Sequence, residues 1–144
     1  MAGQETLTQL DPSGENVDPN TFGQILEMDD DEEERDFSRG IVYGFFEQAE
    51  ETIKKLDKAI ANKDLEALSS LGHFLKGSSA TLGLSKVRDS CEKIQHFGQG
   101  KDAAGNPDQH DSEYFLNLIG QTTQRVREDY ATAEKILKKF FKDE

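Results

Sequence analysis

Hydrophobic residues recur at three- and four-residue steps through most of the chain, a spacing that places apolar side chains on one face of a helix. Four long stretches carry this spacing: residues 36–60, 64–81, 84–98 and 112–140. No segment alternates apolar and polar positions over the length of a strand. Since most of the connections are short, the pattern predicts an all-α protein, folded as an antiparallel four-helix bundle.

The stripes within these stretches predict which residues form the core. In the second stretch the stripe is Leu68, Leu71, Leu75, Ser78 and Leu82, and Gly83 is expected to end that helix in the left-handed conformation. Asp36 and Ser112 are expected to cap the first and last helices. Gly40 and Gly44 lie one turn apart, which indicates that another helix or a partner approaches closely there.

The start of the chain and its longest connection lack the long helical pattern of the four stretches. Residues 1–20 contain two prolines, two glycines and few apolar residues, so we expect a disordered arm. Residues 21–144 then form one domain. The spacing of Phe22, Ile25, Leu26 and Met28 predicts a short additional helix across one end of the bundle. Residues 98–111 are rich in glycine and form a loop.

Charge and composition narrow the classes of partner. The formal net charge of −12 disfavours binding to nucleic acid or to anionic membranes, because an acidic protein surface repels phosphate groups. Residues 27–36 hold eight acids and one base, but they lack the ligand spacing of a calcium loop, which favours a solvated acidic turn. We expect no transmembrane span and no secretory signal. A single cysteine, Cys91, cannot form an internal disulfide, which indicates a reducing, intracellular compartment. Cys91 lies on the apolar face of its predicted helix, so we expect its side chain to be buried.

His73 is the candidate for chemistry. It lies about 200° around its helix from Leu71 and Leu75, so it is expected to point away from the core. Lys76 lies one turn on, and Gly77 leaves out the side chain that would otherwise crowd the imidazole. An imidazole presents an unprotonated ring nitrogen at neutral pH, and a lysine can stabilise charge on a phosphoryl oxygen. One interpretation is therefore that His73 accepts a phosphoryl group. The other is that His73 is an ordinary exposed histidine without a chemical role.

A resemblance favours the first reading. The run from His73 to Leu84, HFLKGSSATLGL, resembles the signature of histidine phosphotransfer (HPt) domains, most closely the single-domain phosphorelay intermediates of fungi. The likeness extends to residues 28–31, 36–40 and 91–95 and covers roughly residues 22–98. In the last helix only the helical pattern remains, and the loop lacks the longer acidic insertion of some relatives.

The resemblance implies a mechanism. His73 would accept a phosphoryl group from a receiver-domain aspartate of a hybrid histidine kinase and pass it to the receiver domain of a response regulator. Lys76 would support the phosphoryl group, Gly77 would keep the approach open, and Gln95 would orient the imidazole. No cofactor is expected, because the divalent metal belongs to the receiver. Ser78 and Ser79 fit the pattern too, although small residues that let helices pack closely explain them equally well.

The receiver is expected to dock on an apolar surface around His73. Six residues match family positions of that surface, although an apolar stripe is usually interior. They are Phe22, Ile25, Met28, Phe37, Ile41 and Phe74.

Two other readings remain open. One is an acidic helical adaptor that is not phosphorylated. The other is the dimerisation fragment of a histidine kinase, which would need a downstream ATP-binding domain. The family resemblance further implies a monomer in the cytoplasm and nucleus, with no ATP-dependent kinase activity of its own. The sequence names neither the kinase, the regulators nor the stimulus, and it does not say whether phosphorylation activates the output.

Overall fold

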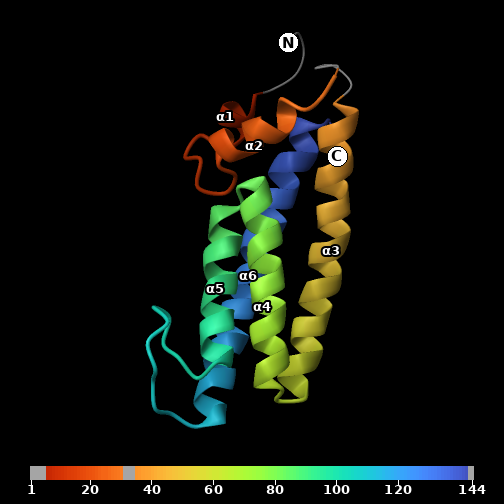
Figure 1. Ribbon diagram of the computed structural model, residues 1–144. Coiled ribbons are helices and arrows are strands. Elements are labelled where there is room, and N and C mark those ends of the chain that lie inside the picture. Colours follow the sequence, from red (N-terminus) through yellow and green to blue (C-terminus); the bar gives the residue numbers. More distant parts are fainter. Residues whose placement is uncertain (1–5, 31–34, 143–144) are drawn as a thin grey trace.

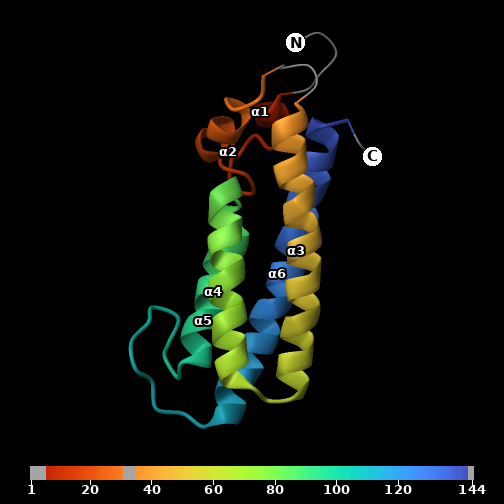
Figure 2. The ribbon, with the colours of Figure 1, turned by 45° about the vertical axis from the view of Figure 1, so that its right-hand side comes forward.

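Four long helices run side by side, and two short helices cover one end of them (Figures 1 and 2). The computed structural model describes residues 6–30 and 35–142. The short helices are α1 (Leu7–Leu10) and α2 (Pro19–Leu26). The long helices are α3 (Asp36–Ala61), α4 (Leu65–Leu82), α5 (Ser85–Gly98) and α6 (Ser112–Phe140). The predicted all-α bundle with an additional N-terminal helix is confirmed.

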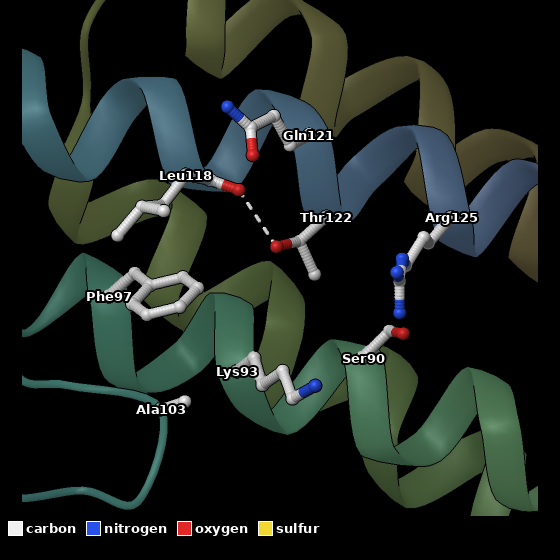
Figure 3. Close-up of a pocket in the computed structure, with 8 residues that line it drawn as sticks. All are labelled: Ser90, Lys93, Phe97, Ala103, Leu118, Gln121, Thr122 and Arg125. Carbon is white, nitrogen blue, oxygen red and sulfur yellow. Dashed lines mark hydrogen bonds between the residues drawn. The ribbon is translucent and has the colours of Figure 1, made fainter.

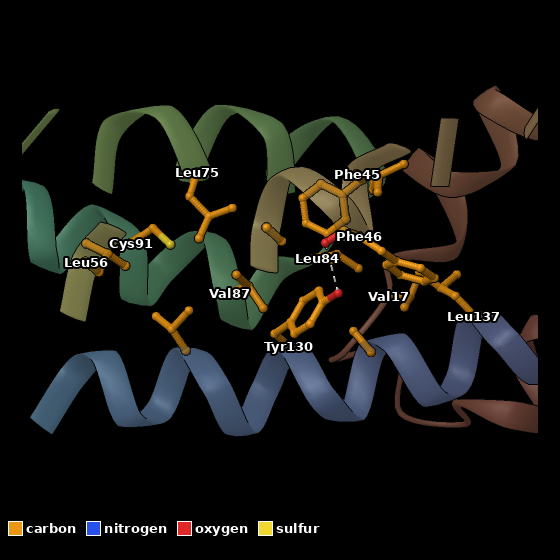
Figure 4. Packing of buried hydrophobic residues seen from close by; sticks show 14 of the residues in the cluster. Val17, Phe45, Phe46, Leu56, Leu75, Leu84, Val87, Cys91, Tyr130 and Leu137 are labelled. Carbon is orange, nitrogen blue, oxygen red and sulfur yellow. Dashed lines mark hydrogen bonds between the residues drawn. The ribbon is translucent and has the colours of Figure 1, made fainter. Parts of the chain in front are cut away.

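The core lies between the four long helices (Figure 4). The three- and four-residue spacing of the last stretch gives a single stripe, and every residue of it is buried in α6: Phe115, Ile119, Thr122, Val126, Tyr130, Ala133, Leu137 and Phe140. Cys91 is also buried, as predicted. Among the described residues, no helix is both long and apolar enough to cross a membrane.

The seam of α4 differs from the predicted one. Gly72 and Ser79 are buried, whereas Leu71 and Ser78 are only partly buried. A Cβ atom on Gly72 would lie 2.8 Å from the Cys91 carbonyl oxygen and 2.9 Å from the Gln95 nitrogen. The backbones of α4 and α5 therefore approach each other where one helix has no side chain, a contact that a search for apolar residues overlooks.

A second glycine, on α5, lies at another close contact between the same two helices. A Cβ on Gly98 of α5 would lie 2.7 Å from the Leu65 carbonyl oxygen and 2.9 Å from Ser69 Cβ. The two glycines lie on different helices: Gly98 ends α5 beside the first turn of α4, and Gly72 lies nearer the middle of the shared seam. Together they fix the distance between α4 and α5.

The predicted disordered arm is wrong for residues 6–20, and residues 1–5 lie outside the described part of the chain. Leu7 and Val17 are core residues. The Asp11 carboxylate accepts hydrogen bonds from the backbone N–H groups of Asn16 and Val17, which closes residues 11–17 into a loop. The N–H of Asp18 donates to the Gly83 carbonyl at 2.8 Å and ties this loop to the end of α4. A few specific bonds order a segment of disorder-prone composition.

The helix caps also differ from those predicted. Asp36 is the first helical residue of α3 rather than its cap, and the N–H of Ser38 donates to the Asp29 carboxylate at 2.8 Å. The cap of α3 thus comes from the segment after α2. Asp111, not Ser112, caps α6 by accepting a hydrogen bond from the N–H of Tyr114. Gly83 is left-handed at φ +81°, as predicted. Residues 31–34 of the acidic run lie outside the described residues.

One buried polar group joins α3 to α6. The Tyr130 hydroxyl lies 3.0 Å from a Glu50 carboxylate oxygen and 3.2 Å from one of Glu134. Burial and the charges of the two carboxylates raise the pKa of Tyr130, so the phenol stays protonated and can donate.

The loop between α5 and α6 is folded against the end of α5. His96 Nδ1 lies 3.0 Å from the Ala103 carbonyl oxygen, and Gly105 packs against the same imidazole ring. The Asp102 carboxylate accepts hydrogen bonds from the N–H groups of Ala104 and Asn106, which tightens the turn. The loop lies at the end of the bundle opposite to α2 (Figure 1).

The contact at Gly72 predicts a matched pair of mutants. Gly72→Ala should lower the free energy of unfolding by about 1–3 kcal/mol, because its Cβ would meet backbone atoms of α5. Gly77→Ala, on the same helix, places its Cβ in open space and should raise the free energy of unfolding by up to about 1 kcal/mol through helix propensity. Urea unfolding of both variants measures the difference, and equal effects would contradict the proposed contact.

The buried thiol predicts a dependence of stability on alkaline pH. Burial raises the pKa of Cys91 from 9.0 to about 12. Above pH 9 the thiol ionises in the unfolded chain but not in the folded one, so its contribution to stability falls between about pH 9 and 12. Wild type should therefore lose stability more steeply over this range than Cys91→Ala, as measured by urea unfolding at each pH. Parallel curves would show that Cys91 ionises equally in both states.

Candidate functional site

His73 lies near the middle of α4 and points to solvent, as predicted. The buried side of the helix is formed by Leu68, Gly72, Leu75 and Ser79, and His73 falls on the other side. Gly77 is exposed, and among residues 6–30 and 35–142 no atom outside its own helix backbone and chain neighbours lies within 4 Å of a Cβ built on it. The face of α4 that follows His73 is therefore open, and a large group can approach the imidazole.

Lys76 stands on the same exposed part of α4 and is partly buried. Within the described part of the chain it forms no ion pair, so its charge is not neutralised by a neighbouring carboxylate. The imidazole and this ammonium group lie one turn apart on one helix, which gives a nucleophile beside a free positive charge.

Gln95 is held on α5 next to the backbone of α4. Its backbone nitrogen would lie 2.9 Å from a Cβ on Gly72, and Gly72 directly precedes His73. The Gln95 Oε1 atom is buried and accepts no hydrogen bond in the described part of the chain. The structure thus brings Gln95 to the α4 seam beside His73 without a bond between the two side chains. The role of Gln95 in orienting the imidazole stays a prediction.

The six residues expected at a docking surface separate into two groups. Met28, Phe37 and Phe74 expose 62%, 47% and 49% of their surface, and Ile41 is partly buried. Phe22 and Ile25 are buried, so their assignment to a docking surface is wrong. The Phe22 ring contacts those of Phe140 and Phe141, because α2 must bury one face against the end of the bundle.

A groove of about 300 Å³ runs between α3 and α4. It is lined by Gly40, Ile41, Gly44, Phe45, Gln48, Ser78, Thr81 and Leu82. Among the described residues, no atom outside the helix's own backbone and the chain neighbours lies within 4 Å of a Cβ built on Gly40 or Gly44, so no other helix approaches closely there. These glycines instead leave the surface hollow, between two of the exposed apolar residues, Phe37 and Phe74. The approach of a partner at these glycines stays a prediction.

Gly72 lies outside the predicted stripe of α4, although a glycine directly before a histidine that is expected to face solvent is a visible signal of a close helix contact. Among the described residues, no group of three His, Cys, Asp or Glu side chains could hold a metal ion. Chemically, the site offers an accessible nitrogen nucleophile, a free ammonium group and an adjoining apolar surface.

Comparison with known proteins relates this geometry to a family. The chain is 48% identical over 125 residues to the multistep phosphorelay regulator 1 of Schizosaccharomyces pombe, covering 87% of this chain and 42% of that protein. It is 48% identical over 95 residues to the phosphorelay intermediate protein YPD1 of Candida albicans, covering 66% of this chain and 50% of that protein. The chain thus spans about half the length of the curated relatives it matches.

The fold agrees with these relatives. The co-crystal structure of the Saccharomyces cerevisiae histidine phosphotransfer signaling protein Ypd1 with the receiver domain of Ssk1 contains a chain that superposes with a TM-score of 0.80 at 29% identity. The match covers 90% of this chain and 97% of that chain. The sequence profile of the Hpt domain matches residues 41–134, which include α4, His73 and most of the bundle around them. This chain belongs to the Hpt domain family.

Proposed function

We propose that this protein is a phosphorelay intermediate that carries a phosphoryl group on His73 between two receiver domains. The observation that carries the proposal is the exposed imidazole on a helix face that Gly77 leaves open. The curated relatives are named for phosphorelay, and the Saccharomyces cerevisiae relative was crystallised with a receiver domain. These features together support the assignment better than either alternative reading.

In the proposed reaction an unprotonated nitrogen of His73 attacks the phosphorus of an aspartyl phosphate on the first receiver. The nitrogen–phosphorus bond forms as the bond between phosphorus and the carboxylate oxygen breaks, so the receiver aspartate leaves as a carboxylate. In the second step an aspartate of another receiver attacks the phosphohistidine, and the imidazole is the leaving group. Positioning and electrostatics govern both steps.

Lys76 and Gln95 have supporting roles in this proposal. The free ammonium of Lys76 would stabilise the phosphoryl oxygens while they lie near the imidazole. Gln95 carries a buried Oε1 without a donor, and an N–H of the imidazole would satisfy it and fix the ring. Gly77 would contribute by the absence of a side chain.

The receiver would dock on Met28, Phe37, Ile41 and Phe74, which we call the apolar patch. Three of its members expose about half of their surface or more, and the groove between α3 and α4 continues from it. Exposed apolar residues grouped beside a reactive side chain are typical of an interaction surface.

Other parts of the proposal concern what the protein lacks and where it works. We expect it to need no cofactor, because the divalent metal would be held by the receiver, and to have no ATP-dependent kinase activity. We also expect a monomer that works in the cytoplasm and the nucleus.

The proposal predicts that His73→Gln abolishes label transfer. Wild type incubated with a receiver domain that carries a labelled aspartyl phosphate should acquire acid-labile label. His73→Gln should acquire none, because an amide is not a nucleophile toward phosphorus. His110→Gln, which changes another exposed histidine, should behave as wild type. Label on His73→Gln would refute the assignment, and receiver binding without transfer by wild type would favour the adaptor.

The apolar patch predicts a loss of affinity for the receiver. Phe74→Ala should weaken binding of an unphosphorylated receiver domain by about tenfold or more, because an exposed phenyl ring would lose its burial in the complex. Tyr114→Ala is the matched control, since Tyr114 is exposed to a similar extent, 38% against 49%, and begins α6 at the other end of the bundle. Isothermal calorimetry measures both, and equal affinities for the two variants would place the receiver elsewhere.

A further inference from the structure

A second groove, of about 280 Å³, lies between α5 and α6 (Figure 3). Its polar lining includes Ser90, Lys93, Gln121 and Arg125, and its apolar lining includes Phe97 and Leu118. In Figure 3 the Arg125 guanidinium and the Lys93 ammonium turn toward the Ser90 hydroxyl from opposite helices. The groove thus combines positive charge with an apolar floor.

Arg125 has no partner in the described part of the chain, unlike the other arginines. Arg35, Arg88 and Arg127 each pair with an aspartate, and Arg39 donates to the Phe141 carbonyl. Arg125 forms no such bond with any described residue, and neither does Lys93. In a protein with a net charge of −12, two unpaired cations facing one groove call for an anionic ligand.

Ser90 supplies a third donor. Its residue surface is 7% exposed, and its hydroxyl forms no hydrogen bond within the described residues, in contrast to Thr122, whose hydroxyl donates to the Leu118 carbonyl at 2.7 Å. A hydroxyl that lines a groove and has no partner among the described residues is placed to donate to a ligand.

The apolar wall of the groove is held in place by the bundle and the loop. Phe97 is buried on α5, and Ala103 closes the side formed by the loop. Ala103 is fixed because its carbonyl accepts a hydrogen bond from His96.

This groove is separate from the site at His73. Lys93 and Gln95 are two residues apart on α5, about 200° around the helix, so they face different neighbours. Gln95 lies against α4, whereas Lys93 faces α6.

We infer that the α5–α6 groove binds a small organic anion, with an oxyanion head on Arg125, Lys93 and Ser90 and an apolar body on Phe97 and Leu118. Arginine binds carboxylate and phosphate in the same bidentate manner, so the head can be either. A compact ligand is favoured over an acidic polypeptide, because each further negative charge is repelled by the acidic protein.

An NMR titration of the full chain tests this inference. Phenyl phosphate and phenylacetate represent the two heads, inorganic phosphate lacks the apolar body, and phenol lacks the ionised head. At least one of the first two should produce saturable shifts at the amides of Ser90, Ala103 and Leu118, and should bind more tightly than inorganic phosphate or phenol. Comparison of the two affinities identifies the preferred head.

Charge-neutralising variants complete the experiment. Arg125→Gln and Lys93→Gln should each weaken binding by about tenfold, because each removes a charged donor. Lys135→Gln makes the same charge change on an exposed residue of α6 that pairs with no described side chain, and it should leave the affinity unchanged. The inference is overturned if no shift saturates, if phenol binds equally well, or if Lys135→Gln weakens binding as much as Arg125→Gln. These shifts do not depend on phosphotransfer at His73.

Discussion

The contact between the backbones of α4 and α5 is the constraint on which the site depends. Two helices can approach this closely only where side chains are absent, and Gly72 and Gly98 provide those positions. Because Gly72 faces α5, the next residue, His73, points about 100° away from that interface. The same contact places Gln95 of α5 against the backbone of α4 beside His73. The exposure of the imidazole and the burial of its expected partner are thus two results of one packing arrangement.

The end of the bundle positions the apolar patch in a different way. The Asp29 carboxylate caps α3 by accepting a hydrogen bond from the N–H of Ser38. Met28 directly precedes Asp29, and Phe37 directly precedes Ser38, so this bond holds the two apolar residues near each other. The α2 helix that precedes this segment is held by Phe22, whose ring contacts Phe140 and Phe141 at the end of the chain's last helix. The segment that carries Met28 is therefore tied to an aromatic cluster whose parts are distant in sequence, so a change at the end of α6 can reach the patch through α2.

The features that could be predicted from the sequence are those that depend on the geometry of a single helix. The exposure of His73 follows from 100° per residue, and the α6 stripe follows from its period. Prediction from the sequence failed where a second segment decides. The spacing of α2 does not reveal the burial of Phe22, because the rings of Phe140 and Phe141 that it contacts come from the other end of the chain. Composition does not reveal the burial of Val17, because its order depends on the hydrogen bond to the Asp11 carboxylate. The groove at Lys93 and Arg125 depends on the register of two helices, which periodicity does not fix.

The position of the α5–α6 loop bears on how such domains diverge. The loop joins its helices at the end of the bundle opposite to α2, and His96 secures its near side. The entropy of closing a loop rises only slowly with its length, so inserted residues there cost little stability. Evolution can therefore lengthen or shorten this connection without moving the imidazole of His73, and the loop is the natural place for related proteins to acquire different sizes.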